Sequence, residues 1–191
     1  NLARAVKKVG ARMALISTDM VYSGLPDDPG PYLESKKPET DVNRVVWYGY
    51  TKSQAEKVAT EILSDKLAIV RIIYPVRAFF EAKSDYLRKQ IQLYQQGKLN
   101  PIFTDQRINL THVDELCGFV DDLIERNFAG VFHCASSDVL SPYEIISYLF
   151  TAVYGNADMV KAGLLADYLD PAKHPERSVP IRNCRYPTFG G

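Results

Sequence analysis

Residues 47–73 read WYGYTKSQAEKVATEILSDKLAIVRII, and in this stretch a helical pattern runs directly into a buried-strand pattern. The helical part, about 47–63, carries an apolar stripe that we expect to face the protein core. The stripe comprises Ala55, Val58, Ala59 and Ile62. Residues 66–73 form a short apolar run, which is typical of a buried strand. Arg71 lies inside this run, and a charge at such a position predicts a carboxylate partner.

The region before this stretch shows the same alternation of helix and strand. Residues 2–9 read as the end of an amphipathic helix that Gly10 closes, and residues 12–17, RMALIS, form a second short apolar run. Residues 23–44 are rich in Pro, Gly, Asp and Ser and read as a long surface loop. Helix, strand, loop, helix and strand therefore alternate, which predicts an α/β fold with a parallel sheet and crossover helices.

The pattern changes after Pro75. Residues 84–96 have helical periodicity and stop at Gly97, and we expect their apolar side chains, Tyr86 among them, to pack inside the protein. We then expect an extended segment at 100–110, a helix at 113–126 capped by Thr111, and a strand at 130–134. A second helix should start at Ser141 with a Ser-Pro-Tyr-Glu capping box and run to about 154. Residues 170–191 are expected to form an irregular tail.

The composition argues against several classes of function. The 191 residues carry 23 basic and 23 acidic side chains, so the formal net charge is zero and indicates no surface for nucleic acid or for an anionic membrane. No apolar run approaches the roughly 20 residues that span a bilayer. The start has neither a signal-peptide core nor a Met. We therefore expect a cytoplasmic location and a chain that begins within a larger protein.

The cysteines and histidines predict no metal site. Cys117, Cys134 and Cys184 are an odd number at wide spacing, as expected for free thiols in a reducing compartment. There is no CxxC motif, and the three histidines lack the spacing of zinc ligands.

The chemistry is carried by Tyr48 and Lys52, in the motif YxxxK at the start of the expected helix. The same motif occurs by direct count at Tyr32, in the Pro-rich loop, and at Tyr94, where the helix is expected to end before the lysine. Only the pair at Tyr48 falls where residues four apart share one helical face. It also follows an apolar strand that ends at the hydroxyl residue Thr18.

These three side chains can move a proton onto or off a sugar oxygen. A phenol has an ordinary pKa of about 10, and the ammonium group of Lys52 favours its phenolate form and can also hold ribose hydroxyls. Thr18 can donate a hydrogen bond to the oxygen on which charge develops, and Tyr48 can give or take the proton. From the residues alone, the alternative is a surface helix pair beside a strand-end cap.

Six successive blocks of the chain resemble the extended short-chain dehydrogenase/reductases, and within them the dTDP-4-dehydrorhamnose reductase-like branch. The blocks are ISTDMVYSG, PYLES, WYGYTKSQAEKV, IVRIIYP, TDQRINLTHVDEL and GVFHCASSDVLSPYEI. The resemblance implies part of a Rossmann-type, doubly wound parallel sheet with a small C-terminal α/β substrate lobe. It implies the C-terminal half of the dinucleotide-binding domain at 1–75 and the substrate lobe at 76–191, with about 111–135 returning to the first domain.

The resemblance also implies NADP or NAD as the cofactor and a nucleotide-sugar 4-ketone as the substrate. The implied catalytic residues are Thr18, Tyr48 and Lys52. The implied cofactor-binding residues are Tyr48, Lys52, Ile73, Tyr74 and Pro75. The implied substrate-binding residues are Asp19, Tyr22, Gln106 and Arg182, the last in a segment shared with Pro180.

The chain departs from the family pattern in several places. The glycine-rich GxxGxxG loop and the segment with the active-site Asn are missing, Met20 stands where an aromatic residue is usual, and Tyr74-Pro75-Val76-Arg77 replaces WVYG. The loop before Tyr48 is longer than in typical reductases. Two alternatives therefore stay open: an NAD-dependent nucleotide-sugar epimerase or dehydratase, and a catalytically silent regulatory subunit of the same fold. A homodimer is compatible with each of these readings.

Overall fold

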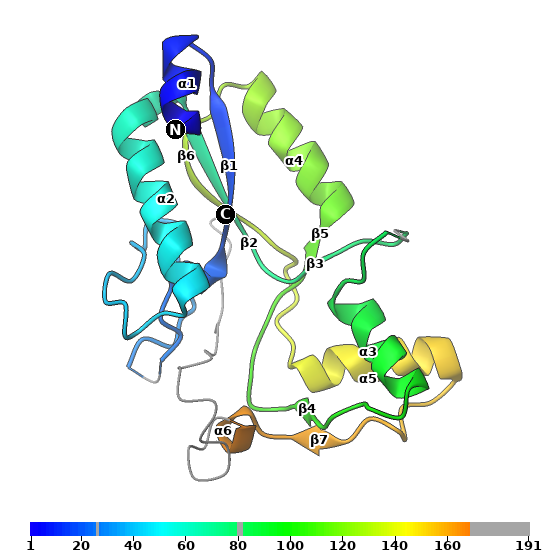
Figure 1. Ribbon diagram of the computed structural model, residues 1–191. Coiled ribbons are helices and arrows are strands. Elements are labelled where there is room, and N and C mark those ends of the chain that lie inside the picture. Colours follow the sequence, from blue (N-terminus) through cyan, green and yellow to red (C-terminus); the bar gives the residue numbers. More distant parts are fainter. Residues whose placement is uncertain (26, 80–81, 169–191) are drawn as a thin grey trace.

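The computed structural model describes residues 1–25, 27–79 and 82–168 (Figure 1). Its main sheet has three parallel strands in the order β1-β2-β6, formed by Met13–Thr18, Leu67–Ile72 and Gly130–Cys134. The register pairs Met13 with Leu67 and Ala68 with Gly130. The predicted α/β class with a parallel sheet is confirmed.

Helices cover both faces of this sheet, as Figure 1 shows. Helices α1 (Leu2–Lys8) and α2 (Trp47–Leu63) lie on one side and α4 (Val113–Glu125) lies on the other. Alternate residues of β2 point to opposite faces, so Leu67 and Ile69 pack with α1 and α2 while Ala68 and Val70 pack with α4. This arrangement explains why the β2 sequence is a continuous apolar run.

The inner face of α2 differs from the predicted stripe. Ala59 is buried and Ile62 is half-buried, as expected, but Ala55 and Val58 are exposed. The buried positions in the first part of the helix are instead Gly49, Ser53 and Glu56. The reason is that this part of α2 lies against polar groups at the carboxyl ends of β1 and β2 rather than against the apolar centre of the sheet.

A smaller part of the described chain has its own core. It contains α3 (Tyr86–Gln95), α5 (Pro142–Tyr154), α6 (Leu165–Tyr168) and the two-residue strands β3 (Pro75–Val76), β4 (Ile102–Phe103), β5 (Thr111–His112) and β7 (Ala162–Gly163). The short strands pair in parallel as β3-β5 and β4-β7. The core of this part comprises Ile73, Ile102, Ile108, Ile145, Ile146, Phe150 and Val160.

The predicted caps have different outcomes. The capping box of α5 is present, because the Ser141 hydroxyl accepts a hydrogen bond from the Glu144 amide and the Glu144 carboxylate accepts one from the Ser141 amide. The prediction that Thr111 caps α4 is wrong, since His112 occupies the cap position. The Thr111 hydroxyl is buried and instead bonds the backbone of Ile73 and Cys134.

These bonds of Thr111 lie at the junction between the sheet and the smaller part. Thr111 Oγ1 accepts from the Ile73 amide at 3.0 Å and donates to the Cys134 carbonyl at 2.6 Å. Beside it, the Asn109 side chain donates to the carbonyls of Ser136 and Asp138. Three chain segments that cross between the two parts are therefore joined by hydrogen bonds.

Residues 1–25, 27–79 and 82–168 contain neither a membrane-spanning helix nor a group of side chains suited to a metal ion. No helix in these ranges is long and apolar enough to cross a bilayer. Across the same residues, no three His, Cys, Asp or Glu side chains gather in a group suited to a metal ion. Cys117 and Cys134 are free thiols, and Cys184 lies outside the described residues.

Candidate functional site

A cavity of about 1110 Å³ lies between the carboxyl ends of β1 and β2 and the smaller part of the protein. Its wall on the sheet side includes Thr18, Tyr48 and Lys52, and its opposite wall includes Asn100 and Gln106. In open α/β sheets, ligands bind at the carboxyl ends of the strands. The three residues that the sequence singled out for catalysis therefore share one wall of a cavity in the expected position.

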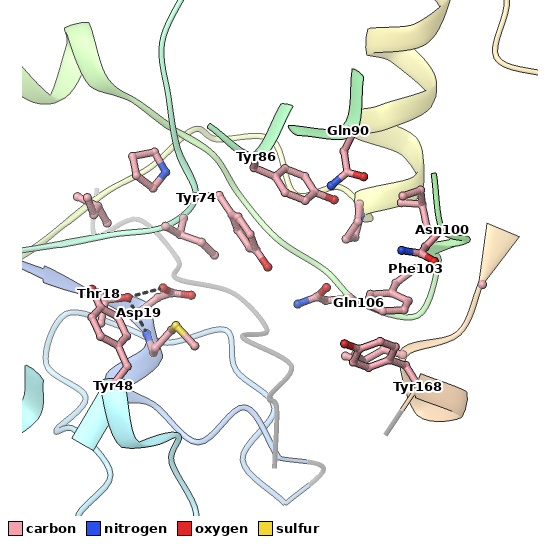
Figure 2. Close-up of a pocket in the computed structure, with 18 of the residues that line it drawn as sticks. Thr18, Asp19, Tyr48, Tyr74, Tyr86, Gln90, Asn100, Phe103, Gln106 and Tyr168 are labelled. Carbon is pink, nitrogen blue, oxygen red and sulfur yellow. Dashed lines mark hydrogen bonds between the residues drawn. The ribbon is translucent and has the colours of Figure 1, made fainter. Parts of the chain in front are cut away.

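Thr18 is the last residue of β1 and caps the 3-10 helix η1 (Asp19–Val21). Its hydroxyl oxygen accepts a hydrogen bond from the Met20 amide at 3.2 Å and donates to a carboxylate oxygen of Asp19 at 3.0 Å (Figure 2). Both Thr18 and Asp19 are buried. The cap bond fixes the position of the hydroxyl oxygen at the cavity wall, while its proton can be turned to another acceptor.

Tyr48 and Lys52 lie one turn apart at the start of α2. The Tyr48 side chain is accessible, with 53% of the residue exposed. Lys52 Nζ donates to the backbone carbonyl of Ile16 at 2.6 Å. The lysine ammonium is therefore held at the strand end, two residues before Thr18, and forms part of the cavity wall.

Gly49 is a functional position that the sequence reading missed. A Cβ atom built on Gly49 would lie 1.9 Å from the carbonyl oxygen of Met20, well inside any permitted contact. The start of α2 thus rests directly on the backbone that follows Thr18. A glycine between Tyr48 and Tyr50 was the available signal, because a glycine inside a helix lowers its stability and often has a packing reason.

Ile73, Tyr74 and Pro75 all line the cavity. Tyr74 has a φ of +38°, a left-handed conformation that is uncommon for a non-glycine residue. Its ring lies 4.9 Å from that of Tyr86, and Figure 2 shows the Tyr74 hydroxyl extending toward Gln106. Burial raises the pKa of Tyr86 above its ordinary value. Tyr86 packs on the core, as expected, and also contributes to the cavity wall.

The smaller part supplies the far wall of the cavity. Gln106 is buried there, and its neighbour Asp105 accepts hydrogen bonds from the backbone amides of Leu165 and Ala166 at 2.7 and 3.1 Å. These bonds hold α6 at the cavity. The wall residues on this side that were not expected from the sequence include Tyr86, Gln90, Asn100, Phe103 and Tyr168 (Figure 2). The rings of Phe103 and Tyr168 meet edge to face at 5.4 Å.

Tyr22, which the resemblance assigns to the substrate side, is not among the described residues that line this cavity. The residue is only 1% exposed, and its hydroxyl group hydrogen bonds with His133 Nε2 at 2.8 Å and accepts from Arg71. Burial raises the pKa of Tyr22 to about 12. Tyr22 therefore belongs to a polar cluster behind the cavity. Arg182 and Pro180 lie outside the described residues.

Comparison with known proteins identifies a family and a curated relative. The family model of the RmlD substrate binding domain matches residues 1–183. The "Probable low-salt glycan biosynthesis reductase Agl14" of Haloferax volcanii is 24% identical over 163 residues, which are 85% of this chain and 52% of that protein. The chain thus spans about half the length of this curated relative.

Solved structures show the same fold at low sequence identity. The dTDP-4-dehydrorhamnose reductase of Bacillus anthracis in complex with NADP superposes with a TM-score of 0.78 at 21% identity, over 99% of this chain and 61% of that one. The Clostridium acetobutylicum dTDP-4-dehydrorhamnose reductase gives 0.71 at 23%, over 99% and 60%. The Bacillus anthracis dTDP-glucose 4,6-dehydratase in complex with NAD gives 0.72 at 15%, over 100% and 56%. These likenesses confirm the Rossmann-like fold.

Proposed function

The chain belongs to the family of the RmlD substrate binding domain, and from this premise we propose that it is part of an NAD(P)H-dependent reductase of a nucleotide-sugar 4-ketone. The observation that carries the proposal is that Thr18, Tyr48 and Lys52 line one cavity at the carboxyl end of β1. A silent regulatory subunit would have no need to keep all three groups on one accessible wall.

Each of the three side chains has a definite task in this proposal. Tyr48 gives its proton to the carbonyl oxygen of the sugar as that oxygen gains charge. Thr18, whose hydroxyl oxygen is fixed by the Met20 amide, donates a second hydrogen bond to the same oxygen. Lys52 leaves the Ile16 carbonyl, binds ribose hydroxyls, and favours the phenolate that Tyr48 becomes after proton transfer.

The residues of this wall fit the nicotinamide end of a dinucleotide. Lys52 supplies a cation, and the backbone of Ile73, Tyr74 and Pro75 turns along the cavity beside it. A bound nicotinamide dinucleotide would supply the hydride for the carbonyl carbon. The relative from Bacillus anthracis, whose structure was solved with NADP, supports the choice of this cofactor class.

The opposite wall is suited to the nucleotide part of the substrate. It combines the uncharged amides of Gln90, Asn100 and Gln106 with the aromatic rings of Phe103 and Tyr168. Amide groups can pair with the polar edge of a base, and aromatic rings can pack against its face. A polar sugar would then lie between this wall and Tyr48.

The test is turnover by the complete protein in which these residues occur, with and without the Tyr48 hydroxyl. We expect NADPH oxidation with a nucleotide-sugar 4-ketone, and a loss on the order of 10²–10⁴-fold in kcat for Tyr48→Phe, because the proton donor is gone. Tyr50→Phe is the matched control: its ring stacks on Trp47 on the same helix. Full activity of the Tyr48→Phe protein would contradict the assignment.

A homodimer and a cytoplasmic location complete the proposal and stay predictions. Analytical ultracentrifugation of the complete protein measures the first, and cell fractionation measures the second.

A further inference from the structure

Directly behind the cavity, α2 and the sheet are joined by a buried ion pair that the mechanism above does not use. Arg71 Nη2 lies 2.6 Å from Glu56 Oε2, and Arg71 Nε donates to Glu56 Oε1 at 3.1 Å. The two side chains are 2% and 4% exposed. Glu56 is thus the carboxylate partner that the sequence required for Arg71 without identifying it.

The carboxylate of Glu56 also contacts the strand that carries Thr18. Ser17 Oγ donates to Glu56 Oε1 at 2.5 Å. Ser17 is buried and immediately precedes Thr18 in β1. The ion pair is therefore hydrogen bonded to the residue that directly precedes Thr18, whose hydroxyl is the proposed catalytic group.

Glu56 also lies in the same helix as Tyr48. Tyr48, Lys52 and Glu56 are spaced four residues apart in α2, so they lie on one face of the helix. Lys52 contacts Ile16 and Glu56 contacts Ser17, so two side chains of this face hold two consecutive residues of β1. Together with the close contact of Gly49 on the Met20 backbone, they set the distance from the start of α2 to the end of β1.

We propose that Glu56, oriented by Arg71, is a positioning residue that holds Tyr48 in register with Thr18 through its bond to Ser17. This inference rests on the proposed function of the same site. The bond becomes decisive when Lys52 turns from the Ile16 carbonyl to a ligand. Once Lys52 has left the Ile16 carbonyl, the bond between Ser17 and Glu56 is the one of these two side-chain bonds that still connects this face of α2 to the end of β1.

A purely stabilising role explains the cluster less well. Taking two charges out of water is costly, and an apolar pair of similar volume commonly gives equal or greater stability. Arg71 also donates to the Tyr22 hydroxyl and to the Lys36 carbonyl, in addition to Glu56. Such a set of directional bonds fixes the carboxylate in one orientation, which positioning needs and stability alone does not.

The sharpest variant is Ser17→Ala, because it removes the link to β1 and leaves the ion pair intact. Its matched control is Ser53→Ala. Ser53 is also buried and lies on α2, but its hydroxyl donates to the Tyr50 carbonyl within the same helix at 2.7 Å. Each variant loses one buried hydroxyl and one hydrogen bond, and Ser17→Ala also loses a contact between helix and strand. Ser17, unlike Ser53, also lines the cavity, so the turnover comparison is read together with a substrate-free measurement.

In the complete protein, we expect Ser17→Ala to lower kcat by on the order of tenfold or more, since a misplacement of about 1 Å can cost roughly a hundredfold. The KM for NADPH should stay near the wild-type value, and Ser53→Ala should retain wild-type kcat. In a Glu56→Gln background, Ser17→Ala should have a smaller effect, because both changes remove the same contact. Equal kcat values for the two serine variants would overturn the proposal.

A second readout needs neither substrate nor cofactor. In protein labelled with ¹³C at the tyrosine Cζ atom, the Tyr48 signal is assigned by its loss in Tyr48→Phe. We expect Ser17→Ala and Glu56→Gln to shift this signal and Ser53→Ala to leave it in place. If the wild type shows no turnover, the proposed function fails. The shift of the Tyr48 ¹³C signal then tests by itself whether Glu56 positions Tyr48. An unmoved Tyr48 signal in both Ser17→Ala and Glu56→Gln overturns it, and Glu56→Gln serves alone if Ser17→Ala does not fold.

Discussion

Gly49 shows how a single residue without a side chain can set the geometry of a site. The helix that carries Tyr48 and Lys52 rests on the backbone at Met20, and the 1.9 Å separation leaves no room for a Cβ atom. Because the obstructing atom is a backbone carbonyl, no rotamer change can relieve the contact. The close approach places the phenol next to the strand end that carries Thr18.

We predict that Gly49→Ala displaces the start of α2 and lowers kcat, with a loss of about 1–3 kcal/mol in the free energy of unfolding from the forced contact. Gly118→Ala is the matched control, since Gly118 lies in α4 and a Cβ there would meet nothing within 4 Å. That change should stabilise the protein by roughly 0.5–1 kcal/mol, because alanine loses less entropy in a helix. Urea unfolding and turnover measure both. Equal stability of the two variants would contradict the close approach.

At the scale of elements, the sequence predicted helix α2 well and its inner face less well. The bounds of the helix follow from residue type and spacing, which are local properties. Ala55 and Val58 were expected to face the core because they are apolar, yet the buried face near the site carries Ser53 and Glu56. A polar inner face cannot be read from hydrophobic periodicity, since its partners Ser17 and Arg71 lie on two separate strands.

Helix α5 allows a prediction about pH, because its capping box contains an ionisable group. Hydrogen bonds from the Ser141 amide and hydroxyl, and then the charge of Arg107, lower the pKa of Glu144. A carboxylate whose pKa is lower in the folded state stabilises the protein above its unfolded-state pKa of about 4.3, and this contribution disappears as the pH falls through the folded-state pKa.

Glu144→Gln should therefore be less stable than wild type near pH 6, and the difference should shrink as the pH falls to about 3. Chemical unfolding of both proteins across this range measures the difference directly. Parallel pH profiles for the two proteins would show that the Glu144 carboxylate contributes nothing to the start of α5.

At the scale of the whole molecule, the sequence identified one wall of the cavity and missed most of the other. Thr18, Tyr48 and Lys52 could be found because Tyr48 and Lys52 form a YxxxK motif at the start of a helix, and Thr18 is a hydroxyl residue at the end of the preceding strand. Phe103 and Tyr168 could not, because they are far apart in the chain and meet only through the pairing of β4 with β7 and the fold of α6. The division at residue 75, with 111–135 returning, stays a prediction about independent folding units.

The junction between the two walls of the cavity depends on the hydrogen bonds of Thr111. Thr111→Val keeps the shape of the buried side chain but removes the partner of the Ile73 amide and of the Cys134 carbonyl. Each buried backbone group left without a partner costs about 1–3 kcal/mol, so the free energy of unfolding should fall by the sum of two such losses. Thr104→Val is the control: its hydroxyl makes a longer bond of 3.3 Å to the Gly163 carbonyl, within the smaller part. Ile73 lines the part of the cavity proposed for the nicotinamide end of the cofactor, so Thr111→Val should also raise the KM for NADPH. Equal effects of the two threonine variants would show that the junction is held by packing alone.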